Sequence, residues 1–284
     1  MRKIFTSRVA KLRKLSREES LLSFLINHVR VVLRFSSRKY DIYRNNIPKI
    51  STRYTREYLS TELSVVEKRD IFLFHHLLLI KRFNPSSMNM MARSNLNIWN
   101  IEVNRNKYSI VMSMDKSKCG EGDVVLEFIE NKTCLFDLSF TFAPGCVVGS
   151  EDASVVLITR LQGRPNRFDA IRRATKACGD IFPGHVLLGA AEGVAGTVDI
   201  TRVCGVGTHQ QLSSRWGNGR FNYDGFWEEL FEERCGAWYT AAVPIPRKPL
   251  SEVSKAHRRR TKRKRLFKDA VANEVGRSLA PHLR

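Results

Sequence analysis

Hydrophobic positions in the first 95 residues recur at helical spacing. Residues 15–33 carry a dense apolar stripe flanked by arginines, and residues 65–83 carry a second one. Apolar residues three and four apart share one face of a helix. The pattern therefore predicts a helix over each stretch, the second ending at the Asn-Pro-Ser-Ser sequence of 84–87.

The period of the pattern changes to two after Leu96. Apolar and polar residues alternate over 96–103, 108–114, 123–130 and 133–142, and 154–161 is continuously apolar apart from its ends. In the fourth stretch Phe136 and Leu138 share one face, whereas Asp137 and Ser139 share the other. Alternation predicts half-buried strands, and the tight connections favour an antiparallel meander with one face packed and the other covered or wet.

Helical spacing returns over 168–178, 185–194 and 223–230, and 199–206 is a further strand. This order predicts an α+β fold with one central antiparallel sheet and helices packed on it. We expect three regions: a basic helical part over 1–95, an α+β core over 96–250, and a basic C-terminal helix and tail over 251–284.

Charge is concentrated at the two ends of the chain. The 284 residues carry 48 Lys and Arg against 28 Asp and Glu, a net charge of +20. Residues 1–40 account for +9 and residues 247–268 for +10, which leaves the remaining 222 residues at +1. Two basic ends on a nearly neutral body predict an anionic partner, either a membrane surface or another polyanion.

Composition excludes several classes of protein. With 43% hydrophobic residues the chain has enough apolar material for a core, so a wholly disordered protein is excluded. Residues 21–26 form the only apolar run near the start, which predicts no secretory signal, and the apolar run 71–80 is too short to span a bilayer. We therefore expect a cytoplasmic protein, with peripheral attachment at the inner membrane.

The six cysteines and seven histidines predict no metal site. The cysteines lie 12 to 32 residues apart without a C-x-x-C pair, so we expect reduced thiols and no structural zinc. The adjacent His75 and His76 point about 100° apart on a helix and do not chelate together; we interpret them as packing or surface residues.

A first candidate site lies between a predicted strand and a helix, in the sequence Arg160-Leu-Gln162-Gly163-Arg164-Pro165. Glycine in such a turn lets backbone N–H groups approach a phosphate at the helix N-terminus. The sequence is similar to the R-x-x-G-x-[G/A] loop with which GNAT acyltransferases hold the pyrophosphate of acyl-CoA, except that Pro165 removes one donor. The resemblance implies a GNAT-like form of the fold and acyl-CoA as the cofactor. The alternative is an ordinary turn with solvated arginines.

A second candidate site combines His209, Tyr223 and Glu228. Acyl transfer needs a general acid or base within hydrogen-bond reach of the reacting amine, and these three residue types supply one. The alternative is structural, because Tyr223 and Phe226 belong to the apolar stripe of an amphipathic helix.

The third candidate site is the basic C-terminal segment 255–268, with nine Lys and Arg and no acid. Such a segment binds nucleic acid through phosphates, or anionic lipid. No nucleic-acid-binding module is recognisable, so nucleic acid is the weaker prediction. The residues predicted to contact the anion are Arg258, Arg259, Arg260, Lys262, Arg263, Lys264 and Arg265.

Five motifs in order resemble the VirK/YbjX family of bacterial proteins over roughly residues 65–276. They are Ile-Thr-Arg-Leu-Gln-Gly at 158–163, Ile-Arg-Arg-Ala-Thr-Lys at 171–176, Val-Cys-Gly-Val-Gly-Thr-His at 203–209, Tyr-Asp-Gly-Phe-Trp-Glu-Glu at 223–229 and Pro-Arg-Lys-Pro-Leu at 246–250. The chain departs from the family pattern after Lys176, where Cys178-Gly179 and Phe182-Pro183 replace an expected His-Gly and Arg-Pro.

The resemblance implies a Gram-negative bacterial origin and a part in virulence, envelope integrity and tolerance of cationic antimicrobial peptides. It implies no established reaction. Our leading hypothesis is an accessory factor of this kind that acts at an anionic surface, with an unknown protein partner. The competing hypothesis is a GNAT-like acyltransferase that uses an acyl-CoA or acyl-carrier donor.

Overall fold

The computed structural model describes residues 53–114, 120–216 and 221–284, together with residues 26 and 29. The helix expected over 15–33 lies outside these residues except for Ile26 and Val29, which are helical and exposed. Cys119 also lies outside them. The other helices and strands expected from the sequence can be compared with the structure directly.

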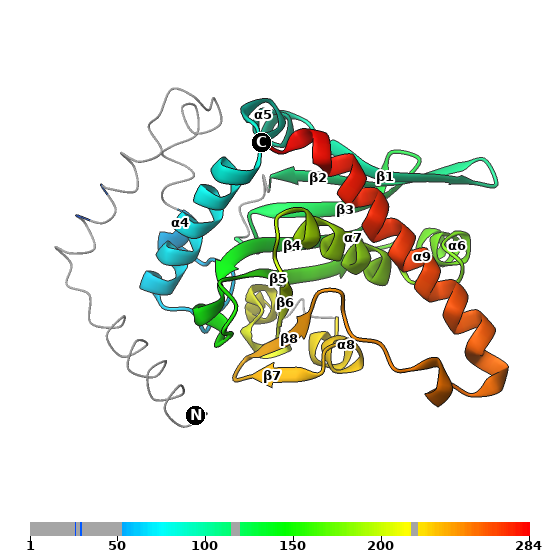
Figure 1. The fold of residues 1–284 in the computed structure, drawn as a ribbon. Helices are drawn as coiled ribbons and strands as arrows, with labels where there is room; N and C mark the ends of the chain where they lie inside the picture. Colours follow the sequence, from blue (N-terminus) through cyan, green and yellow to red (C-terminus); the bar gives the residue numbers. More distant parts are fainter. Residues whose placement is uncertain (1–25, 27–28, 30–52, 115–119, 217–220) are drawn as a thin grey trace.

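The described residues form the expected helices and strands in the expected order, together with one helix and two short strands that the sequence pattern did not predict (Figure 1). The α-helices are α4 (Val65–Arg82), α5 (Pro85–Arg93), α6 (Phe168–Ala177), α7 (Pro183–Thr197), α8 (Tyr223–Leu230) and α9 (Lys255–Leu279). The strands are β1 (Leu96–Val103), β2 (Asn106–Met114), β3 (Val124–Glu130), β4 (Thr133–Pro144), β5 (Ser154–Gly163), β6 (Arg202–Val206), β7 (Glu233–Cys235) and β8 (Trp238–Ala242). Six short 3₁₀ segments, η1 (Arg53–Thr55), η2 (Gly145–Val148), η3 (Thr208–Gln210), η4 (Leu212–Trp216), η5 (Leu250–Glu252) and η6 (Ala280–His282), connect them.

Local sequence signals set the limits of α4. The Ser64 side chain accepts a hydrogen bond from the Glu67 backbone N–H, and the Glu67 carboxylate accepts one from the Ser64 N–H. This reciprocal capping satisfies N–H groups that the first turn of a helix leaves without partners. The Asn84 side chain caps the following helix by accepting a hydrogen bond from the Ser87 backbone N–H, and Pro85 occupies the first position of that helix.

The strands form one mixed sheet of eight strands in the order β1-β2-β3-β4-β5-β6-β8-β7. Strands β1 to β5 are an antiparallel meander, which confirms the expectation from their spacing. The sequence did not predict that β6 joins β5 in parallel, through a crossover containing α6 and α7. The pattern also missed β8, which pairs with β6, and β7, which pairs with β8 and forms the edge of the sheet.

Helices α7 and α9 cover one face of the sheet (Figure 1). The face below them carries Phe136, Leu138 and Phe128, all at most 2% exposed, so the apolar face predicted for β4 is confirmed. Helix α9 packs closely on α7 at Gly193, because this residue has no side chain. A Cβ at Gly193 would lie 2.4 Å from the Ala272 carbonyl oxygen. The basic helix is thus part of the fold, and its Phe267 contacts Trp99 of β1.

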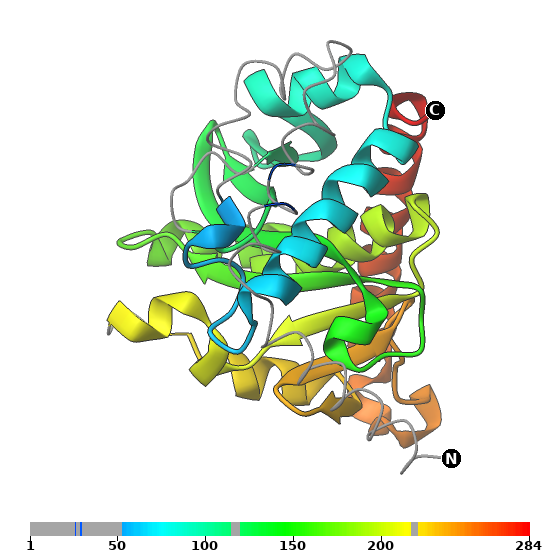
Figure 2. The same ribbon diagram turned by 90° about the vertical axis from the view of Figure 1, so that its left-hand side faces the viewer.

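Helix α4 lies across the C-terminal end of β4, near Phe142 (Figure 2). His75 of α4 stacks on Phe142, and its Nδ1 accepts the Phe142 N–H at 3.1 Å. His75 and His76 are buried, which confirms the packing interpretation. Helices α4 and α9 therefore share a core with the sheet, whereas the domain limits 1–95, 96–250 and 251–284 stay a prediction.

Candidate functional site

Charged side chains are buried on the sheet face opposite α7, around the end of β5. Arg160 lies 2.8 Å from Asp137 Oδ1 through its Nε and 2.8 Å from Glu121 Oε2 through Nη1. Asp137 and Ser139, which the alternation placed on the second face, are 2% and 5% exposed, so that face is covered here.

Arg164 extends this charged cluster toward solvent. Its Nη2 lies 3.0 Å from Asp137 Oδ2 and 3.4 Å from Glu127 Oε1, and its Nε contacts the Cys134 sulfur at 3.4 Å. The Arg164 side chain is 41% exposed, whereas Asp137 is almost fully enclosed. Asp137 thus bridges both arginines that the sequence assigned to a pyrophosphate.

Burial and ion pairing act against each other in this cluster. Burial raises the pKa of Asp137, and the two arginines offset only part of this effect. Burial alone would lower the pKa of Arg160, but the Asp137 and Glu121 carboxylates outweigh it and raise that pKa. Arg160 is therefore a cation held between two carboxylates.

Glu121 joins the cluster to the loop after β6. Its carboxylate accepts a hydrogen bond from Gln211 Nε2, and its backbone oxygen accepts one from the Thr159 hydroxyl. Ser213 in turn donates to Gln211. The sequence analysis missed Glu121, Asp137 and Gln211, and the one available signal was an acid in the middle of the aromatic strand β4.

The turn after β5 begins later than expected. Gly163 is still a strand residue opposite Phe136, and Arg164 N–H donates to the Leu135 oxygen. A Cβ at Gly163 would lie 2.9 Å from the Phe136 ring and 3.3 Å from Ile171. Glycine is needed here for packing, and Gln162, opposite Asp137, is half-buried. The chain turns at 165–167, where Asn166 has φ +58°.

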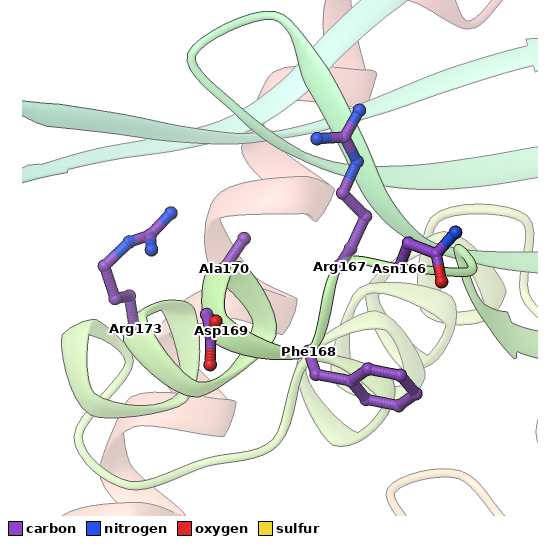
Figure 3. Close-up of a pocket in the computed structure, with 6 residues that line it drawn as sticks. All are labelled: Asn166, Arg167, Phe168, Asp169, Ala170 and Arg173. Atoms are coloured by element: carbon purple, nitrogen blue, oxygen red, sulfur yellow. The ribbon is translucent and has the colours of Figure 1, made fainter.

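A cavity of about 290 Å³ lies beside this turn, at the start of α6 (Figure 3). Arg167 and Arg173 extend from α6 on the same side, with Ala170 between them. Arg173 also pairs with Glu130 at 3.1 Å. Asp169 also lines the cavity, so the features that suit an anion there are the exposed Arg167 and the first backbone N–H groups of α6, one turn beyond the predicted loop.

The three predicted catalytic residues lie in two environments. The Tyr223 hydroxyl is buried and accepts the Leu161 N–H of β5 at 3.2 Å, and burial raises its pKa. Glu228 is exposed, 3.3 Å from the Tyr239 hydroxyl, and His209 is exposed beside Thr208. No hydrogen bond joins these three residues to one another within the described part of the chain.

The basic segment of α9 is largely exposed. Arg259, Arg260, Lys262 and Arg263 are open to solvent, and Arg258, Lys264 and Arg265 are half-buried. Arg258 donates to the Ser251 and Val253 oxygens, and Arg265 to the Lys248 oxygen. Among the described residues, Arg259, Lys262 and Lys264 form no ion pair, so these cations are not neutralised within the fold.

No helix among the described residues combines the length and apolar character that a membrane-crossing segment needs. Within the same ranges, no three His, Cys, Asp or Glu side chains are placed to hold a metal ion.

The family model named "Protein of unknown function (DUF535)" matches residues 25–276. The chain belongs to the DUF535 family. It is also 24% identical over 241 residues to the uncharacterized protein YbjX of Escherichia coli K12, a match that covers 80% of this chain and 71% of that protein. The resemblance to the VirK/YbjX family is thereby confirmed. No solved structure matches.

The family motifs gather where β5 and β6 separate. Residues 158–163 are the end of β5, 171–176 lie on α6, 203–209 run from β6 into η3, and 223–229 form α8. Tyr223 connects α8 to β5 through the bond to Leu161, and Trp227 Nε1 donates to the Val206 oxygen of β6. The motifs at 158–163, 203–209 and 223–229 therefore lie together at the end of β5, where Arg160 belongs to the charged cluster.

Proposed function

We propose that the protein is an accessory factor that binds an anionic surface of the bacterial cell envelope from the cytoplasmic side. In that role it supports envelope maintenance, tolerance of cationic antimicrobial peptides and virulence. The observation that carries the proposal is the exposed basic face of α9, where Arg259 and Lys262 have no carboxylate partner among the described residues. Unpaired cations on a folded helix are available to a counter-anion.

Packing of α9 on the sheet supports this role. Val271, Val275 and Leu279 are buried, so the C-terminal half of α9 anchors the helix and the basic N-terminal half is presented to solvent. Each basic residue near an anionic bilayer contributes about 1 kcal/mol to binding. Several of them acting together give an attraction that depends strongly on salt.

The proposal is tested by co-sedimentation with vesicles of anionic phosphatidylglycerol mixed with phosphatidylethanolamine. The triple variant Arg259→Gln, Lys262→Gln, Arg263→Gln removes about 3 kcal/mol of attraction, so we expect binding at low salt to weaken by roughly a hundredfold. The control is Lys81→Gln, Arg234→Gln, Arg277→Gln, which removes the same charge from exposed positions elsewhere. Equal binding by the two variants, or no wild-type binding to anionic vesicles, contradicts the proposal.

A second candidate function is acyl transfer by a GNAT-like enzyme. The observation that favours it is the geometry of β5 and β6, which pair in parallel only over Val156–Ile158 and then separate at an extra residue, Thr159. The loop that resembles the pyrophosphate loop of GNAT acyltransferases follows directly from the end of β5. The cavity at Arg167 and Arg173 would then hold the pyrophosphate.

Under this candidate we assign the proton donor to Tyr223, whose hydroxyl accepts the Leu161 N–H and whose raised pKa keeps it protonated. Calorimetry with coenzyme A and acetyl-CoA tests the idea: we expect heat of binding for wild type and its loss in Arg167→Glu, which removes an exposed cation from the cavity. An absence of heat at millimolar ligand rejects the candidate. Binding that persists in Arg167→Glu rejects the assigned location.

A further inference from the structure

Several elements end together at one edge of the molecule, which we call the basic end. The β1–β2 and β3–β4 turns lie at this edge, β5 finishes there, and α6 follows directly (Figure 1). Each element contributes exposed cations, namely Lys107, Lys132, Arg167, Lys176, Arg260 and Arg263.

Contacts between the elements make the basic end one continuous surface. Lys107 N–H of β2 donates to Asn131 Oδ1 in the β3–β4 turn at 2.9 Å. Arg173 of α6 pairs with Glu130 beside that turn at 3.1 Å. Asp180, after α6, lies 3.4 Å from Arg260 and 3.7 Å from Arg263 of α9. The basic part of α9 is therefore one side of a surface that also includes α6 and two hairpin turns.

The acids at the basic end do not cancel its charge. Glu130 and Asp180 are engaged by arginines of the same surface, and Asp169 lies 3.8 Å from Arg172. Glu102 on β1 is opposite Lys107. A surplus of cations remains, spread across the whole edge.

An aromatic side chain stands within this cationic surface. Phe168, the first residue of α6, is 70% exposed, the highest value among the exposed large hydrophobic side chains that the structure describes. Figure 3 shows its ring on the same turn as Arg167 and directed away from the guanidinium groups of Arg167 and Arg173. An exposed aromatic ring beside basic residues is the composition of segments that lie in a membrane interface.

We propose that the basic end docks on an anionic lipid bilayer with Phe168 inserted at the boundary between headgroups and acyl chains. This inference rests on the proposed function and specifies its partner as lipid. A polyanion without an apolar phase, such as duplex DNA, complements the cations but leaves the Phe168 ring in water. A bilayer complements both, because it places apolar chains just beneath its negative charges.

The test compares Phe168→Ala with Met90→Ala, an exposed apolar residue on α5 at the opposite end of the sheet. Phe168→Ala should weaken partitioning to anionic vesicles roughly tenfold or more without changing the melting temperature, because the ring is already exposed in the fold. Met90→Ala should bind like wild type. Duplex DNA serves as a second probe, and Phe168→Ala should bind it unchanged.

A second measurement locates the side chain directly. Phe168→Trp adds a fluorophore whose emission, after subtraction of the wild-type spectrum, should shift to the blue on anionic vesicles and be quenched by lipids brominated near the headgroup end of the acyl chain. Equal vesicle binding by Phe168→Ala and wild type, with an unquenched tryptophan, overturns the inference while the charge variants of α9 still report on the proposed function. Preference for DNA over vesicles also overturns it.

Discussion

Asp137 forms ion pairs with both Arg160 and Arg164 in the charged cluster. Its carboxylate lies within 3.0 Å of both Arg160 and Arg164, on a strand position that is 2% exposed. Removing one partner of a buried ion pair leaves an uncompensated charge, which costs more than the pair contributes. Arg160 is therefore committed to the fold, and an anionic ligand near β5 would be bound by the more exposed Arg164 and Arg167.

The two buried histidines give the protein a defined acid sensitivity. Burial lowers the pKa of His75 to about 4 and that of His76 to about 3. Each folded-state pKa lies below the unfolded value of about 6.5, so the unfolded chain binds protons first as the pH falls. Their contribution to stability is complete above pH 6.5 and is lost as the pH falls from 6.5 toward 4.

We expect the free energy of unfolding in urea to fall by about 1.4 kcal/mol per pH unit for each histidine between pH 6.5 and 5. His75→Asn keeps an acceptor for the Phe142 N–H and removes the titrating group. The free energy of unfolding of this variant should therefore fall less steeply with decreasing pH than that of wild type, by the share of one histidine. His209→Asn is the control, since His209 is exposed in the fold. Equal slopes for wild type and His75→Asn would contradict the prediction.

At the scale of elements, β4 is the strand that organises the sheet. One side carries Phe136, Leu138 and Phe140 against α7, and the other carries Asp137 and the buried polar groups. Because successive side chains of a strand point to opposite faces, one strand supports both the apolar core and the charged cluster.

Leu138→Asp tests the assignment of these faces. Leu138 is fully buried, and an unpaired carboxylate there should cost several kcal/mol, enough to unfold a domain of ordinary stability. Leu266→Asp on α9 is the control, because that side chain is 60% exposed. A soluble Leu138→Asp protein with a cooperative thermal transition would refute the assignment.

The contact between α7 and α9 depends on Gly193 of α7 but not on Gly196 of the same helix. Gly193→Ala places a Cβ against the Ala272 oxygen and should destabilise the protein by about 1–3 kcal/mol through overpacking. Gly196→Ala, on the same helix, meets no atom within 4 Å and should be neutral or stabilising by up to about 1 kcal/mol. Thermal melts of both variants provide the measurement, and a reversed order would show that α9 does not pack closely there.

At the scale of the whole molecule, the fold gathers charge that the sequence distributes. Cations from β2, the β3–β4 turn and α6 join those of α9 at one edge, although among these four elements only α9 is conspicuously basic in sequence. Several cations acting together on one anionic surface make binding strongly dependent on ionic strength.

We expect wild-type binding to anionic vesicles to fall steeply between about 50 and about 300 mM salt, a range that brackets the physiological ionic strength, at which the Debye length is about 8 Å. Neutral phosphatidylcholine vesicles should bind weakly at every salt concentration. The measurement is co-sedimentation across this range, and salt-independent binding would indicate that apolar contacts rather than charge dominate.

The sequence by itself determined the order and type of most elements. Periods of 3.6 and 2.0 identified α4, β1 to β5, α6, α7 and β6, because a helix or strand with one buried face must repeat its apolar residues at that spacing. The family also followed from short motifs. The pattern missed β8, and it missed β7, whose three residues are too few to show a period.

Only the tertiary structure decided what the polar residues do. Asp137 alternates with aromatic residues and was compatible with a solvent-facing position, but the loop carrying Gln211 and the residues around Glu121 cover that face. Leu161 and Tyr223 are 62 residues apart in the chain and meet at the end of β5 only because β6 joins β5 in parallel. Ion pairs and covered faces depend on contacts between distant segments, and the spacing of residues along one segment carries no information about them.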